Sequence, residues 1–338
     1  MPGNLPYGAV PDDQSGDAMR RHEFNAVFRA IEEMSWSQRR QLIARLRTVQ
    51  AAEEVRCIVE ERLQWLAACP HGCGLHVVRN GVARGLPRYK CRDCSRTFNA
   101  LTGTPLARLR YRERWLNQAQ VLIDGLSITK ASQHLEVARS TAFRWRHRFL
   151  ALPHHVKAGQ LDGIVEADET CILKSCKGQP ERRRCELGRK PRGRGGRATI
   201  RGMSVEHDVV LVVRDRSGAC TDQIVAALDT AHLAAVLQPV LAADAVLCTD
   251  GSGALAAAAR YLQLEHHAIN ASAGRHVIGP WHINNVNGYH GRLKNWLRKF
   301  NGVASSYLPH YLGWFRALDR LRPRNLTPPA LLALAIGI

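Results

Sequence analysis

Apolar residues recur at helical spacing near the start of the chain. Within residues 18–66, Phe24 and Phe28 belong to one stripe, and Leu42 and Leu46 belong to a second. Positions three and four residues apart share one face of a helix. The pattern predicts two or three helices, whose expected role is packing or self-association.

Three shorter helices are predicted over residues 112–151, in the rhythm of a helix–turn–helix. Ser127 or Thr129 is expected to begin the second helix and Ser140 to cap the third, because hydroxyl side chains accept hydrogen bonds from free N–H groups at helix starts. The positions of the third helix expected to face its core are Ala142, Trp145 and Phe149.

Farther along, apolar runs short enough for strands alternate with helical stretches. The runs "GIVEADETCI", "DVVLVVRDRSG", "ADAVLCTDGSG" and "HHAIN" read as strands, while "ALAAAARYLQL" and "HINNVNGYHGRLKNWL" read as helices. Strands followed by alternating helices and strands indicate a mixed α/β domain with a central sheet.

The net charge of the chain indicates a class of binding partner. Its 338 residues hold 48 Lys and Arg against 29 acids, which gives a net charge of +19 and a pI near 10.1. Such a balance favours a polyanion, with nucleic acid ahead of an anionic membrane surface, although a basic soluble protein without such a partner is the plain alternative.

No run of eighteen apolar residues occurs, and the start of the chain lacks a secretory pattern. The apolar tail "PALLALAIGI" is too short to span a bilayer and is expected to pack on a helix. We therefore expect no membrane partner and a cytoplasmic, nucleoid-associated location.

Two cysteine pairs flank a predicted hairpin. Cys69 and Cys73 precede it, Cys91 and Cys94 follow it, and Asn80-Gly81 is expected to form its turn. Two such pairs gather four thiolates tetrahedrally around Zn²⁺. The pattern predicts a closed, structural zinc ribbon, against the alternative of four unrelated cysteines.

The third helix of the predicted helix–turn–helix has a polar face opposite its core face. Thr141, Arg144 and Arg148 lie on that face at helical spacing. Thr and Arg side chains on one side of a helix suit the major groove of DNA, so we predict that they bind DNA. The alternative is a helical spacer with a solvated basic face.

Acidic residues occur inside or directly after two predicted strands. Glu166 and Asp168 share one face of the first strand, Glu169 lies on the other, and Asp250 ends a later strand. A carboxylate in an apolar strand is costly unless it binds a cation or a partner. Together, Asp168 and Asp250 could hold Mg²⁺, which prefers oxygen ligands. Separately, they could be an edge-strand charge and a turn residue.

The helix in "HINNVNGYHGRLKNWL" begins with residues that form helices poorly. Asn287 and Lys294 are seven residues apart and so share one face. An Asn oxygen can bind Mg²⁺ without bringing charge, and a lysine two turns on could hold a phosphate.

The order of motifs over about residues 65–320 resembles that of bacterial insertion-sequence transposases of the ISXO type. These motifs are, in order, the cysteine pairs, "VEADETCI", a basic loop, "CTDGSGAL" and "HINNVNGYHGRLKNWL". The resemblance implies an RNase H-like catalytic domain of the DDE type, in which Asn followed by Lys replaces the third acid. It makes Asp168, Asp250 and Asn287 the ligands of Mg²⁺ or Mn²⁺ and Lys294 a DNA contact. Glu166 is expected to compensate for the missing charge.

The basic loop, residues 174–201, contains eleven Lys or Arg residues. We expect it to grip DNA phosphates, against the alternative of a solvated loop. Its DNA-binding residues are expected to be Arg182, Arg183, Arg184, Arg189, Lys190, Arg192, Arg194 and Arg197.

Five segments follow from these patterns. They are a helical segment (1–64), a zinc ribbon (65–106), a helix–turn–helix (107–155), an RNase H-like domain (156–322) and a C-terminal tail (323–338). The expected function is a transposase that binds the ends of its element and cleaves and joins DNA, at least as a homodimer on DNA. Two alternatives are a DNA-binding regulator descended from a transposase and a nuclease of the same fold.

Overall fold

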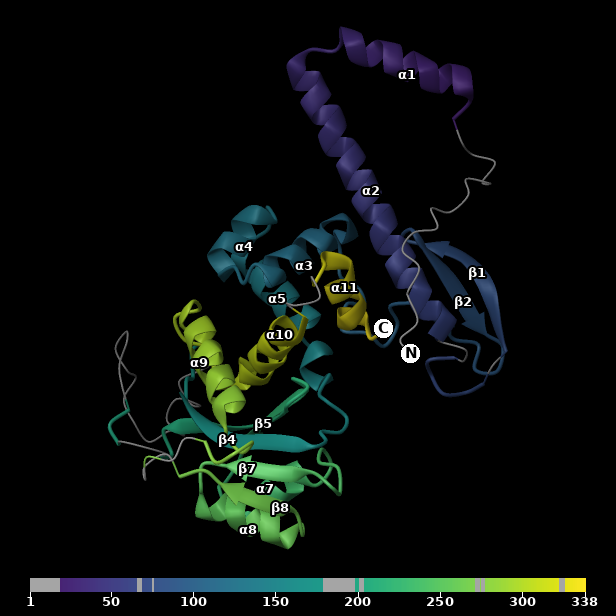
Figure 1. Cartoon of the computed structure of the whole chain (residues 1–338). Helices are drawn as coiled ribbons and strands as arrows, with labels where there is room; N and C mark the ends of the chain where they lie inside the picture. The colour runs from purple at the N-terminus through teal and green to yellow at the C-terminus, as the bar shows by residue number, and fades with distance from the viewer. Residues whose placement is uncertain are drawn as a thin grey trace. The chain divides into compact units, whose positions relative to one another are not determined.

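The structure is a computed structural model of the chain (Figure 1), and it describes residues 19–65, 69–74, 76–178, 198–200, 204–270, 274, 277–321 and 326–338. It divides into two compact units, residues 1–53 and residues 54–338, which are described separately. Among the described residues, no helix combines the length and apolarity needed to cross a membrane.

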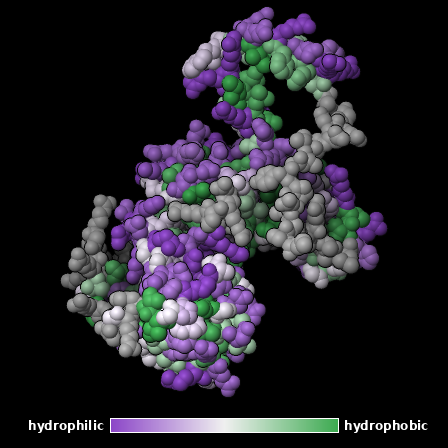
Figure 2. Space-filling model, viewed as in Figure 1, coloured by the Kyte–Doolittle hydropathy of each residue, from purple (hydrophilic) through white to green (hydrophobic). Residues whose placement is uncertain are grey.

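The first unit contains α1 (Arg21–Glu33) and the first part of α2 (Trp36–Trp65), so the predicted N-terminal helices are confirmed. Ser35 and Gln38 form a reciprocal cap at the start of α2, where each side chain accepts from the other's backbone N–H. The apolar stripes stay exposed, with Phe28 58% accessible, and Figure 2 shows hydrophobic surface on these helices.

The second unit begins with the last part of α2, which is followed by a small antiparallel sheet of β1 (Val77–Ala83), β2 (Leu86–Cys91) and β3 (Thr97–Phe98). The hairpin turn lies at Arg84-Gly85, so the predicted turn at Asn80-Gly81 is wrong. Arg84 and Gly85 both have positive φ (55° and 70°), as a tight hairpin turn requires. The register shifts between Arg79 and Val82, so Asn80-Gly81 forms a bulge within β1.

A helix–turn–helix follows, made of η1 (Arg112–Arg114), α3 (Trp115–Ile123), α4 (Ile128–His134) and α5 (Arg139–Phe149). The Ser127 hydroxyl caps α4 by accepting from the Lys130 N–H, as predicted. The predicted cap at Ser140 is wrong, because α5 begins after Ala138 and Ser140 lies inside its first turn. The predicted core positions are confirmed as buried: Ala142, Trp145 and Phe149.

After η2 (Pro153–His155), the chain forms a five-stranded sheet in the order β6-β5-β4-β7-β8. Its strands are β4 (Ile164–Leu173), β5 (His207–Asp215), β6 (Cys220–Val225), β7 (Val246–Thr249) and β8 (Glu265–Ala268). The pairs β4–β5 and β5–β6 are antiparallel, and the pairs β4–β7 and β7–β8 are parallel. The predicted mixed α/β order is confirmed.

Helices cover both faces of this sheet (Figure 1). They are α7 (Thr230–Leu237), α8 (Gly253–Tyr261), α9 (Asn284–Arg298) and, after η4 (Ser305–Tyr307), α10 (Leu308–Leu321). Val165 and Ala167 pack with α7 and α8, while Val210 and Val212 belong to the core shared with α9, α10 and the helix–turn–helix.

The final helix, α11 (Pro328–Ile336), packs on α3, which confirms the expected docking of the apolar tail on a helix. A hydrogen bond of 2.9 Å from Trp314 Nε1 on α10 to the Leu122 carbonyl also joins the helices of the five-stranded sheet to the helix–turn–helix. The two parts of this unit therefore share one hydrophobic core.

We expect Asp222→Ala to lower the free energy of unfolding by about 3–5 kcal/mol. Asp222 and Arg316 form an ion pair in which both side chains are at most 4% exposed, and Tyr289 also donates to Asp222. The variant leaves the Arg316 guanidinium buried without a counter-charge. Urea unfolding measures the change. Asp229→Ala, which removes the exposed cap of α7, is the matched control and should cost about 1 kcal/mol. Equal losses in both variants would contradict the expectation.

Candidate active site and zinc ribbon

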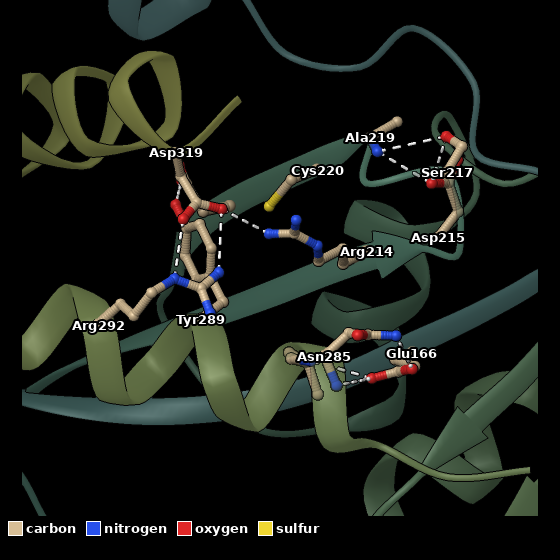
Figure 3. Close-up of polar contacts among 12 residues, drawn as sticks. Glu166, Arg214, Asp215, Ser217, Ala219, Cys220, Asn285, Tyr289, Arg292 and Asp319 are labelled. Atoms are coloured by element: carbon tan, nitrogen blue, oxygen red, sulfur yellow. Dashed lines mark hydrogen bonds and ion pairs between the residues drawn. The ribbon is translucent and has the colours of Figure 1, made fainter. Parts of the chain in front are cut away.

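Glu166 on β4 explains the unusual first turn of α9 (Figure 3). Its fully buried carboxylate accepts from the backbone N–H groups of Asn285 (2.8 Å) and Val286 (2.9 Å), and from the Asn285 side chain (2.8 Å). N–H groups at a helix start have no partner within the helix, and a negative charge there is favourable. The carboxylate therefore offsets the poor helix propensity of the Asn residues.

An arginine and a histidine also lie beside the same carboxylate. Arg216 Nη1 lies 3.0 Å from Glu166 Oε1, and His282 Nδ1 lies 3.3 Å from it. Arg216 also donates to the Pro280 and His282 carbonyls, which ties the segment before α9 to the end of β5. These contacts favour a structural role for Glu166 over the metal-binding role predicted from the sequence.

Asp168 and Asp250 lie at neighbouring positions of the sheet. In the parallel pairing of β4 with β7, Glu166 is opposite Cys248, and each aspartate is two residues farther along its own chain segment. The Asp168 side chain is 14% exposed, and Asp250, directly after β7, is exposed. Carboxyl ends of parallel strands meet at one edge of a sheet, where ligands of α/β proteins bind.

A third acidic residue, Glu169, interacts electrostatically with the two aspartates. Burial, followed by the charges of Asp168 and Asp250, raises the pKa of Glu169 to about 7. Its Oε2 atom is buried without a hydrogen-bond partner among the described residues. Three carboxylates that repel one another, one of them with a buried free oxygen, suit a divalent cation with oxygen ligands. The residues present therefore fit the metal that the fold implies.

Helix α9 brings further side chains to this edge. His290 Nδ1 lies 3.5 Å from Asp168 Oδ2. Asn287 and Lys294 are exposed on the same helix, and the Lys294 charge acts on Cys171, three residues after Asp168. Their assignment as metal ligand and DNA contact stays a prediction.

Sequence reasoning missed Glu169 and His290 as residues of this site. The adjacency of Glu169 to Asp168 was visible, but strand alternation placed it on the opposite face. His290 lies three residues after Asn287, close to one helical turn, and that spacing was the available signal.

The four predicted zinc ligands come together in the ribbon. Their Sγ atoms all lie within 4.8 Å of one another, with Cys69–Cys73 at 3.2 Å and Cys73–Cys91 at 3.7 Å, and all four cysteines are free. Thiolates around one tetrahedral zinc are about 3.8 Å apart, given Zn–S bonds of about 2.3 Å. The hydrogen bond with Cys73 is the main cause that lowers the pKa of Cys94 to about 7, which favours a thiolate. The cluster fits Zn²⁺.

On α5, Arg144 is exposed, and Thr141 and Arg148 are half-buried, opposite the buried core positions. The DNA-binding residues predicted in the basic loop, Arg182 to Arg197, lie outside the described residues. Both DNA-binding assignments stay predictions.

A five-stranded sheet of this order, with acids within β4 and directly after β7 and a helix–turn–helix before it, has the architecture of an RNase H-like transposase. Residues 160–316 match the ISXO2-like transposase domain, and residues 108–160 match a homeodomain-like domain. Residues 160–316 therefore form an ISXO2-like transposase domain, as the resemblance in sequence implied.

One relative is a protein in transposable element ISH50 of Halobacterium salinarum, 28% identical over 257 residues, which cover 73% of this chain and 83% of the relative. Among solved structures, the crystal structure of a pre-cleavage Mos1 transpososome is similar over 62% of this chain and 77% of its own. The sequence identity is 14% and the TM-score is 0.21, so this likeness carries no argument.

We expect Cys91→Ser to lose the zinc that the wild-type protein carries. Cys91 is buried within the thiol cluster, and loss of one thiolate leaves three ligands for a tetrahedral ion. Elemental analysis of purified protein by mass spectrometry gives the zinc content. Cys57→Ser, at an exposed cysteine outside the cluster, is the control and should keep a full equivalent. Equal zinc in both variants would rule out the predicted ligand set.

The metal-free protein should lose stability as the pH rises through the range in which Glu169 ionises. Because the folded-state pKa is raised from 4.5 to about 7, the folded state binds more protons than the unfolded state in this interval. The contribution of Glu169 to stability is therefore greatest below pH 4.5 and falls until about pH 7.

Glu169→Gln, which cannot ionise, should remove this fall and gain about 1–3 kcal/mol relative to wild type between about pH 5 and pH 8. Urea unfolding in chelator at about pH 5 and at about pH 8 measures the gain, with Glu33→Gln on α1 as the control. A Glu169→Gln variant that follows the wild-type pH dependence would refute the assignment.

Proposed function

We propose that the protein binds the ends of its insertion sequence and cleaves and joins DNA strands at the edge of the sheet that carries Asp168 and Asp250. The observation that supports this most is the β4–β7 register, in which Glu166 pairs with Cys248 and each aspartate follows two residues later, with Glu169 next to Asp168. Asp168 and Glu169 lie within β4, and Asp250 directly follows β7, so the sheet fixes the backbone positions of these residues.

Asp168 and Asp250 would hold divalent cations, with Asn287 on α9 as the proposed third ligand. When bound, Mg²⁺ or Mn²⁺ supplies charge stabilisation for in-line displacement at phosphorus. Water is the nucleophile in cleavage, and the freed 3′-hydroxyl attacks target DNA in joining. Lys294, exposed on α9, would bind a phosphate near the reacting group.

Two groups of residues are proposed to contact DNA. Thr141, Arg144 and Arg148 on α5 would contact the element ends in the major groove. The basic residues of segment 174–201 would neutralise phosphates without reading sequence. Zinc in the Cys69–Cys94 cluster would be structural, and the joining of two ends calls for at least a dimer on DNA.

A strand-transfer assay tests this function. Labelled DNA from the flanks of the coding region is incubated with the protein and Mg²⁺ or Mn²⁺. Asp168→Ala and Asp250→Ala should each abolish cleavage and joining, and should bind the DNA within about two-fold of wild type because α5 is unchanged. Glu265→Ala, which removes an exposed acid on β8, is the matched control and should keep full activity.

The alternatives give different results in the same assay. Wild-type protein that binds the DNA specifically and forms no product would favour a DNA-binding regulator descended from a transposase. Cleavage without joining would favour a nuclease. If Asn287→Ala kept full joining activity, Asn287 would not be a ligand, although the two aspartates would be unaffected.

A further inference from the structure

His290 has an environment that its place in the helix does not require. It lies on the buried side of α9 and is only 7% exposed. Its Nδ1 atom faces Asp168 Oδ2 at 3.5 Å, and its Nε2 atom is buried without a hydrogen-bond partner in the part of the chain that the structure describes. A buried imidazole with one free nitrogen costs free energy unless something binds it.

The spacing between His290 and Asp168 is informative. At 3.5 Å, the nitrogen and oxygen are at the outer limit of a hydrogen bond. Two neighbouring ligands of one octahedral cation, each about 2.1 Å from the ion, lie about 3 Å apart. A small movement of either side chain therefore lets both bind the same ion.

Two residues that follow the same aspartate on β4 also have polar atoms without hydrogen-bond partners among the described residues. Glu169 Oε2 and Thr170 Oγ1, both directly after Asp168 on β4, are buried without hydrogen-bond partners among the described residues. Thr170 shares the face of Asp168 that α9 covers, and Glu169 lies on the other face. Unpartnered polar atoms thus occur on both residues that follow Asp168 and on His290 of α9.

We propose that His290 is a direct ligand of the divalent cation held by Asp168, and that its imidazole biases this centre towards Mn²⁺ over Mg²⁺. The inference rests on the function proposed above. Mg²⁺ strongly prefers oxygen ligands, whereas imidazole suits transition metals, and Mn²⁺ accepts both. His290 supplies a further ligand from α9, in addition to the proposed Asn287, and adds no negative charge.

Electron spin echo spectroscopy of Mn²⁺ bound to the zinc-loaded, full-length protein tests this directly. An imidazole nitrogen bound to Mn²⁺ gives a nitrogen coupling that carboxylates and water do not give. We expect this coupling in the wild-type protein. His290→Gln, which keeps most of the side-chain volume, should lose it and should bind Mn²⁺ about 10–100-fold more weakly by titration calorimetry. Its Mg²⁺ affinity should change by less than about three-fold.

His232→Gln is the matched control, because His232 is half-exposed at the start of α7, outside the candidate site. It should keep the nitrogen coupling and the wild-type Mn²⁺ affinity. A wild-type protein that binds Mn²⁺ without nitrogen coupling would overturn the inference, and no folded variant is needed for that result. Coupling that persists in His290→Gln would overturn it as well.

The titration of Asp168→Ala separates this inference from the proposed function. If Mn²⁺ binding requires Asp168 and lacks the nitrogen coupling, only the role of His290 fails. If Mn²⁺ binds equally well without Asp168, the proposed metal site itself fails and the inference falls with it.

Discussion

The Glu166 carboxylate holds the first turn of α9 against β4, and the geometry of the candidate site follows from that contact (Figure 3). From Glu166 to Asp168 the strand advances about 6.6 Å. From Asn285 or Val286 to His290 the helix advances about 6–7.5 Å. Two elements anchored at one point and rising by equal amounts bring His290 opposite Asp168. A charge that looks like a metal ligand in the sequence instead sets the register of the helix.

Other acids of this region pair with arginines. Asp319 on α10 accepts from Arg214 and Arg292 (Figure 3), and buried Asp222 pairs with buried Arg316. Burial alone would raise the pKa of Asp319, but hydrogen bonds from both arginines lower it. In a chain with a net charge of +19, these carboxylates are compensated within the fold. Glu169 instead has a pKa raised by burial and by the charges of Asp168 and Asp250, an arrangement that suits a cation.

Sequence patterns predicted the order of strands and helices because buried strands and amphipathic helices have different periods. They also placed Asp168 correctly within a strand, which is the central strand of the sheet. Predictions from local turn and cap signals were wrong where tertiary packing determined the structure. Asn80-Gly81 forms a bulge, and Ser140 lies inside a helix. The structural role of Glu166 depends on which helix covers which strand, and that information is not in the local pattern. The spacing of His290 from Asn287 was visible in the sequence, but its approach to Asp168 depends on the same packing.

The site's charge balance gives a physical reason for an amide at position 287. Glu169 already has a pKa raised to about 7, with the charges of Asp168 and Asp250 among the causes. A glutamate at position 287 would bring a fourth carboxylate to the proposed centre and add repulsion in the metal-free state. Asn287 and His290 can offer ligand atoms without adding negative charge. In the proposed site, three strand-borne carboxylates supply the charge, and the helix supplies neutral donors that select the ion.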